Sequence, residues 1–267
     1  MRIAITMCHG ISAGGDKPLT KEHFDALVSI ARELEFESID YDDLFAWRQG
    51  ERDIPERSIM FDFDHPMKSM RYEIHEVLAA HGYRGTLFIN TGPLNEMYSK
   101  PLPPDHQREF ATWDELAELV ELGWHIGSHT VTHPNLSDLF EEDPSGEKLR
   151  DELAECDAML KEKLGVDSED FAFTGTSWSS AAEKEVMDRY RFGRLWIVGS
   201  VYQVDGKQMR YAELAGVAGE DEEDGGPPAA ARYIEKDLNP YRLPSMELQA
   251  LIYEPDAFRN YLQGALE

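Results

Sequence analysis

Residues 123–139 read GWHIGSHTVTHPNLSDL, in which a short apolar strand pattern is followed at once by two histidines, His129 and His133. Active sites of parallel α/β sheets and barrels lie at the carboxyl ends of the strands, which is where both histidines fall. A spacing of four residues puts the two imidazoles on one side of a helical turn, as a shared divalent metal requires. The segment therefore predicts a metal site directly after a buried strand.

Outward from this segment, apolar runs suited to buried strands alternate with helical patterns. We expect strands at 3–7, 58–63, 85–90, 124–128, 171–175 and 194–200. We expect helices at 20–35, 70–81, 113–122, 147–163 and 180–191. Repeated strand and helix with short connections is typical of a parallel sheet covered by helices. The many units without a linker favour a closed or nearly closed α/β barrel in a single domain over 1–267, although an open sheet has the same periodicity.

One break in composition interrupts this pattern at residues 219–231, GEDEEDGGPPAAA, where acidic residues, Gly and Pro replace any apolar period. About 36 residues follow it, which is too few for an independent core. We therefore predict a mobile acidic surface loop and not a domain boundary.

The HTVTH segment, with its flanking Gly, Ser, Pro, Asn and Leu, closely resembles the signature of polysaccharide deacetylases with a NodB homology domain, carbohydrate esterase family four. Further similar segments are PLTKEHFDALVSIARELEFESIDYDDLFAW (18–47), IPERSIMFDFDHPMKS (54–69), RGTLFIN (84–90) and LNPYRLPSM (238–246). The resemblance implies a distorted (β/α) barrel that holds a divalent metal, most often zinc, through one carboxylate and two histidines. It also implies hydrolysis of an N-acetyl or O-acetyl sugar, with a second carboxylate as general base.

The family's first motif, usually TFDDG, can be aligned here in two registers. Without a gap, Asp64 falls on the general base and His65 on the metal aspartate; a shift of one residue makes Asp62 the base and Asp64 the ligand. Asp62 and Asp64 are two apart on a strand and face the same side, so both registers are geometrically possible. The catalytic candidates are Asp64 and Asp62, and the metal-ligand candidates are Asp64, His65, His129 and His133.

The later motifs depart from the family pattern. Thr174 stands where the third motif has Pro, Ser245 where the fourth has Arg after LP, and Tyr253 and Glu254 occupy the region of the acid histidine of the fifth. Glu254 could replace that acid if burial raised its pKa. His9 lies where members often carry a Tyr-His pair, and the sequence leaves open whether it lines the site or is structural. The alternatives to a deacetylase are a catalytically silent metal-binding relative and an allantoinase-like hydrolase of another C–N bond.

The net charge of −26, from 52 acidic against 26 basic residues, restricts the partners and the setting of the protein. A chain this acidic repels phosphate backbones and anionic membranes, so we expect neither nucleic acid nor membrane as a partner. The resemblance implies an acetylated sugar or similar small polar substrate. The acid excess and few lysines resemble haloarchaeal proteins. With Cys8 and Cys156 far apart, no signal-peptide pattern and no apolar run of membrane-spanning length, we expect a cytoplasmic protein.

We predict that the thermal midpoint of unfolding rises steeply with KCl concentration. Salt shortens the range of charge repulsion to about 3 Å near 1 M, which relieves the self-repulsion of a chain that is this acidic. The measurement is a thermal melt followed by circular dichroism from low to multimolar KCl. A midpoint that stays constant over that range would contradict a salt-adapted protein.

Overall fold

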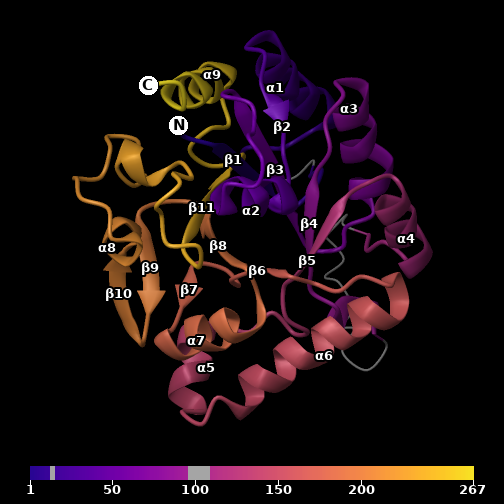
Figure 1. The fold of residues 1–267 in the computed structure, drawn as a ribbon, viewed down its shortest axis with the longest axis vertical. Coiled ribbons are helices and arrows are strands. Elements are labelled where there is room, and N and C mark those ends of the chain that lie inside the picture. Colours follow the sequence, from indigo (N-terminus) through magenta and orange to yellow (C-terminus); the bar gives the residue numbers. More distant parts are fainter. Residues whose placement is uncertain (13–15, 96–108) are drawn as a thin grey trace.

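Seven parallel strands close into a barrel in this computed structural model, which describes residues 1–12, 16–95 and 109–267 (Figure 1). Around the barrel their order is β1-β11-β8-β6-β5-β4-β3, and pairing of β1 with β3 closes it. Their bounds are β1 Ala4–Cys8, β3 Ser58–Asp64, β4 Thr86–Ile89, β5 His125–Ser128, β6 Asp170–Ala172, β8 Phe192–Ile197 and β11 Leu243–Glu247. The short β2, Glu37–Ser38, pairs with the first two residues of β3.

Helices surround the barrel, as Figure 1 shows for α1, α3, α4, α6 and α7. The α-helices are α1 Lys21–Glu33, α2 Tyr41–Gln49, α3 His75–Ala80, α4 Trp113–Glu121, α5 Leu136–Glu142, α6 Glu147–Leu164, α7 Ser180–Arg189, α8 Tyr211–Ala215 and α9 Pro255–Gly264. A π-helical turn, η1 Met70–Ile74, precedes α3, and η2 Gly92–Leu94 and η3 Ala229–Ala231 are 3₁₀ turns. The amphipathic α1 and α4 begin at the N-caps Thr20 and Thr112, whose side chains accept backbone N–H groups.

The barrel interior is divided along the strands into an apolar half and a polar half. Apolar side chains early in the strands form one buried cluster, which includes Ile5, Met60, Phe192 and Leu243. Later positions on the same strands carry buried polar groups, among them Asp62, Asp64, Arg194, Ser245 and Glu247. Because side chains two apart on a strand face the same way, these polar groups continue the interior rows of the apolar ones toward the carboxyl end. The barrel is thus a packed core at one end and a polar site at the other.

A small second sheet lies beside the barrel and is not predicted by the sequence pattern above. Its strands are β7 Ser177–Trp178, β9 Val201–Val204 and β10 Lys207–Arg210, in the order β10-β9-β7. Asp205 and Gly206 connect β9 to β10 with positive φ angles of 47° and 76°. Positive φ at both central residues is typical of a tight hairpin, for which Asp-Gly is a favoured pair.

The expected fold class is confirmed, and the closed ring of strands excludes the open sheet. Within residues 219–231, the acidic positions 220–224 are exposed, whereas Gly226 to Pro228 are buried. Asp224 receives two hydrogen bonds of 2.7 Å from the Arg232 guanidinium. The mobility of this loop stays a prediction. Within the described part of the chain, no helix combines the length and apolarity needed to cross a membrane.

Candidate metal centre

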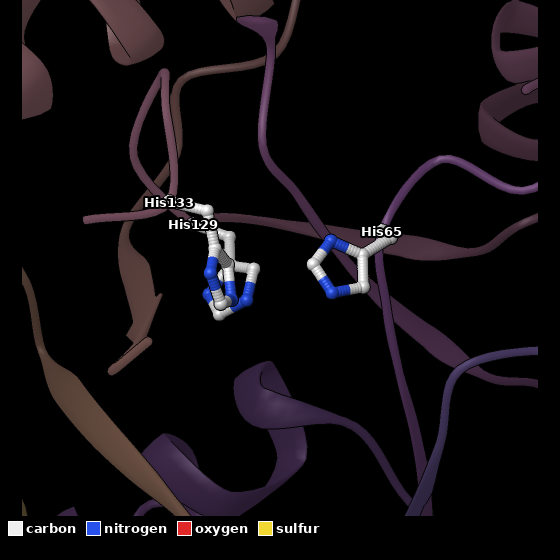
Figure 2. Close-up of side chains that lie close together, drawn as sticks. All are labelled: His65, His129 and His133. Atoms are coloured by element: carbon white, nitrogen blue, oxygen red, sulfur yellow. The ribbon is translucent and has the colours of Figure 1, made fainter. Parts of the chain in front are cut away.

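Three histidines meet at the carboxyl end of the barrel. His65 follows β3, and His129 and His133 follow β5, the neighbour of β4. Their nearest ring nitrogens lie within 4.8 Å of one another, which is the only such grouping of His, Cys, Asp or Glu in the described residues. Figure 2 shows His65 on one side and the other two on the opposite side, with the rings turned toward the space between them. The spacing suits three nitrogen ligands of one metal ion.

The backbone that presents these histidines is in an unusual conformation. His65, Thr130 and His133 have φ angles of 69°, 66° and 57°, in the left-handed region that non-glycine residues rarely occupy. The helical turn expected for residues 129–133 is therefore wrong, because the segment is a bend that precedes α5. Glu152 supports this bend by accepting hydrogen bonds of 2.8 Å from the amides of Val131 and Thr132. The bend, and not a helical turn, brings the imidazoles of His129 and His133 close together.

The hydrogen bonds of the histidines leave ligand atoms free. His129 donates from Nδ1 to the carbonyl oxygen of Ala172 at 2.7 Å, so its Nε2 carries the lone pair. That Nε2 is buried without a hydrogen-bond partner. His65 likewise pairs its Nδ1 with Oδ1 of Asn90 at 2.8 Å. A buried nitrogen lone pair aimed at two further imidazoles fits a metal ligand, and such outer hydrogen bonds are how proteins orient metal-binding histidines.

The charge state of the three imidazoles agrees with this interpretation. Burial lowers the pKa of His65 to about 3, with the neighbouring His9 and His133 adding to the effect. Burial also lowers the pKa of His129, well below its ordinary value, and that of His133. All three are therefore neutral near pH 7, which is the form that binds a metal.

Asp64 lies next to this cluster and is held by an arginine. The guanidinium of Arg194 donates from Nη1 to Oδ2 of Asp64 at 3.0 Å and from Nη2 to Oδ1. Both side chains are buried, and Oδ2 of Asp64 is 3.8 Å from Nε2 of His129. Burial alone would raise the pKa of Asp64, but Arg194, and less strongly His129, bring it below its usual range. Asp64 is thus an ionised carboxylate with a fixed orientation beside the histidines.

Asp62 lies one step deeper in the barrel. Its Oδ2 accepts a hydrogen bond of 2.7 Å from the hydroxyl of Tyr41 and is 3.4 Å from Nε of Arg194. Burial raises the pKa of Asp62 to about 7, although Arg194 and the Tyr41 hydroxyl oppose the shift. The histidine grouping includes His65, as the alignment without a gap requires, and the choice of Asp64 or Asp62 as the base stays a prediction. Asp64 is not part of the histidine grouping, and Asp62 supports Arg194 from below.

Arg194 was not among the candidates from the sequence. It is on β8, which pairs with β11, and β11 carries Ser245 where the family pattern has Arg. An arginine from the adjacent strand therefore reaches the aspartate, so the site does not lack an arginine. A signal was present, because Arg194 begins the otherwise apolar run RLWIVG and a charge inside a buried strand needs a partner.

His9 lines the site. Its ring stacks on that of His65, with centroids 5.2 Å apart, and its Nδ1 is 3.4 Å from Oε2 of Glu247. The same Glu247 oxygen accepts a hydrogen bond of 2.7 Å from the indole N–H of Trp196. His9 and Glu247 come from the carboxyl ends of the adjacent strands β1 and β11. The sequence left His9 open and did not predict Glu247, whose position depends on strand pairing.

The other altered positions lie around the centre. Thr174 donates its hydroxyl to the carbonyl of Pro134, the residue after His133, and so helps to hold the bend. Tyr253 donates to the carbonyl of Pro18 at 2.9 Å. Glu254 is exposed at the N-cap of α9 and is not part of the histidine grouping. The structure therefore brings together His65, His129 and His133, with Asp64 beside them, and leaves Glu254 outside.

A closed (β/α) barrel with histidines and an arginine-bound carboxylate at the carboxyl ends of its strands has the arrangement of a (β/α)-barrel enzyme, whose active site lies at that end. The sequence model of the polysaccharide deacetylase family matches residues 51–189, slightly more than half of the chain. The protein belongs to this family, as the resemblance of its motifs indicated. Among curated proteins, none matches the sequence.

Solved structures share the fold. The Streptococcus pyogenes deacetylase PplD in complex with acetate has a TM-score of 0.69 and 14% identity, covering 100% of this chain and 99% of that one. IcaB from Ammonifex degensii has a TM-score of 0.68 and 15% identity, covering 100% and 97%. The de-N-acetylase from Aggregatibacter actinomycetemcomitans has a TM-score of 0.62 and 13% identity, covering 73% and 88%. At these identities the likeness establishes the barrel fold.

We predict that Asp62→Asn changes how stability depends on pH. A folded pKa of about 7 means that native Asp62 keeps a proton that the unfolded chain releases near pH 4, so wild-type stability falls as pH rises between about 4 and about 7. Asparagine does not titrate. The free energy of unfolding of wild type minus that of Asp62→Asn should therefore fall across this window and level off above it. Urea unfolding of both metal-free proteins at several pH values measures it, and a constant difference would contradict a protonated Asp62.

Proposed function

We propose that the protein is a metal-dependent hydrolase that removes an acetyl group from an N-acetyl or O-acetyl sugar. The observation that carries the proposal is the position of ionised Asp64, fixed by Arg194, beside three converging neutral imidazoles. Imidazole ligands suit zinc, as they also suit copper, iron and nickel, and we take zinc as the metal to test first. Membership of the polysaccharide deacetylase family supports the substrate class.

In the proposed mechanism, His65, His129 and His133 would hold the metal, which would supply polarisation of the acyl oxygen and a lower pKa of water. Asp64 takes the proton from the water that attacks the acyl carbon. Its carboxylate is in the basic form because Arg194 lowers its pKa, and the paired hydrogen bonds hold it in one orientation. Asp62 accepts a hydrogen bond from Tyr41 and lies 3.4 Å from Nε of Arg194, so it supports Arg194 from the deeper end of the site.

The leaving group needs a proton, and we place the acid at His9 instead of Glu254. His9 stacks on His65 at the edge of the cluster, whereas Glu254 is exposed at the start of α9. Glu247 lies 3.4 Å from Nδ1 of His9, which leaves Nε2 on the other side of the ring to face a substrate. As the C–N or C–O bond breaks, that proton passes to the departing nitrogen or oxygen, and acetate and the deacetylated sugar remain.

The first test removes the proposed ligands. Wild-type protein should bind about one divalent metal per chain and release acetate from N-acetylglucosamine oligomers or from an acetylated sugar ester. His129→Ala combined with His133→Ala should remain folded, bind no metal and release no acetate. His81→Ala is the matched control, since His81 pairs with Asp25 at the end of α3. The measurements are elemental analysis and an acetate assay in high KCl. Unchanged metal content in the double variant would contradict the ligand assignment, and no hydrolysis by fully metallated wild type would contradict the activity.

The second test concerns the acid. An amide releases an amine, which must be protonated as it leaves, whereas an activated aryl acetate releases a phenol that needs little help. His9→Gln should therefore slow acetate release from an N-acetyl sugar by roughly 10² or more while changing aryl acetate hydrolysis by less than about tenfold. Glu254→Gln is the matched control and should change neither rate. Equal losses on both substrates in His9→Gln, or a selective loss of amide hydrolysis in Glu254→Gln, would contradict the assignment.

A further inference from the structure

The three histidines of the centre are held in different ways. His129 is fixed through its ring, which is hydrogen-bonded to a backbone carbonyl of β6, and His65 is fixed through its ring by Asn90. The ring of His133 has no such partner elsewhere in the described residues and interacts with its own backbone instead. The direction of that ring therefore follows from the backbone that carries it, which is the bend at residues 129–133.

Hydrogen bonds hold the backbone of this bend from two sides. The carbonyl oxygens of Thr130 and Val131 accept from the amides of residues 91 and 92, after β4, at 3.2 and 2.8 Å. The amide of His133 donates to the Thr130 hydroxyl at 3.1 Å. The segment belongs to no helix or strand, so its remaining amides depend on acceptors from elsewhere in the chain. The acceptor for the two amides in the middle of the bend is a side chain of α6, Glu152.

Glu152 contacts the bend with both of its carboxylate oxygens. Oε2 accepts from the amides of Val131 and Thr132, each at 2.8 Å, and Oε1 accepts from the Thr132 hydroxyl. Hydrogen bonds from successive backbone amides to a carboxylate are stronger than those between neutral groups. Thr130 and His133, on either side of this pair, have the positive φ angles that non-glycine residues rarely adopt. Glu152 thus holds the strained segment at its centre.

The helix that carries Glu152 is itself fixed to the barrel. α6 packs against β5 (Figure 1). The hydroxyl of Tyr190 lies 2.9 Å from Asp157, on α6, and 3.3 Å from Oγ of Ser128, the last residue of β5. The buried residues of α6 are Leu149, Leu153, Cys156 and Leu160. Because the helix cannot shift easily, the position of the Glu152 carboxylate sets the position of the bend.

We infer that Glu152 is a positioning residue of the metal centre, which holds the bend so that the ring of His133 faces His65 and His129. The inference rests on the proposed metal site. Its oxygens contact backbone amides and a hydroxyl, and not an imidazole, so the length of the side chain matters in this role more than its charge. Groups that orient metal ligands typically change metal affinity by about 10- to 100-fold when they are removed.

Glutamine and aspartate variants separate the length of the side chain from its charge. Glu152→Gln loses the charge but keeps an oxygen that can accept from both amides, and its NH₂ group can donate to the Thr132 hydroxyl. Glu152→Asp keeps the charge but is one methylene shorter. We expect the dissociation constant for Zn²⁺ to rise about tenfold or more in Glu152→Asp and to stay within about threefold of wild type in Glu152→Gln.

The measurement is competition for Zn²⁺ between the full-length protein and a chelator in high KCl near pH 7. The matched control is Asp151→Ala, which removes an exposed carboxylate from the neighbouring position of α6 and should leave the dissociation constant unchanged. Circular dichroism of the metal-free proteins checks that each variant is folded. Should Glu152→Asp not fold, Glu152→Gln still decides between the two effects, because an effect of charge predicts weaker binding in that variant.

Double variants test whether Glu152 acts through His133. On a His133→Ala background, Glu152→Asp should change the dissociation constant for Zn²⁺ by less than about threefold, because the ring that it orients is absent. On a His65→Ala background, the same substitution should still raise the constant about tenfold. An equal loss on both backgrounds would overturn the assignment to His133. The single variants decide the question where two imidazoles bind too weakly to measure.

The outcomes separate the inference from the proposed function. Wild-type affinity in Glu152→Asp, or an equal loss in Glu152→Asp and Glu152→Gln, would overturn the inference whether or not the protein releases acetate from a sugar. Weak binding in Glu152→Asp together with near-normal binding in Glu152→Gln would support it even if no acetylated sugar is hydrolysed. Wild type that takes up no Zn²⁺ would overturn the metal site and the inference with it.

Discussion

The structure of the site depends on one buried interaction, in which Arg194 lies between Asp62 and Asp64 inside the barrel. Burying an arginine and two carboxyl groups is costly unless they find partners; here Arg194 is paired with Asp64 and lies 3.4 Å from Asp62, which accepts a hydrogen bond from Tyr41. Arg194 comes from β8 and the aspartates from β3, which are not neighbours around the ring. The interaction therefore spans the interior, and it can form only when the barrel is closed.

This ion pair determines what the neighbouring groups can do. Because both oxygens of Asp64 point to Arg194, the carboxylate is ionised and fixed, and it is His65 that lies in the grouping with His129 and His133. His65 reaches the other two histidines only with a left-handed backbone, and Thr130 and His133 share that conformation. Backbone strain of this kind persists where the surrounding structure holds it, and here the supports are Asn90, Glu152 and Thr174. The residues that depart from the family motifs and their neighbours therefore hold one another in place around the histidines.

Where a residue departs from the family pattern, a residue of similar chemistry is found on a different strand of the barrel. Ser245 replaces an arginine on β11, and an arginine appears on the adjacent β8. The region of the acid histidine holds Tyr253 and Glu254, which lie outside the histidine grouping, while His9 approaches from β1 together with Glu247 from β11. Residues at the carboxyl ends of different strands can occupy the same volume, so one strand can supply a group that another has lost.

The sequence by itself predicted a parallel α/β fold, six of the seven barrel strands and the pair His129 and His133, because period, length and local motif are properties of contiguous residues. It also indicated that Asp62, Asp64 and His65 belong together, although it could not choose between two registers. Only the tertiary structure decided the bend in place of a helical turn, the partner of Asp64 and the position of His9. These depend on contacts such as Asp64 with Arg194, 130 residues apart, which no local pattern encodes because they follow from how the strands close into a ring.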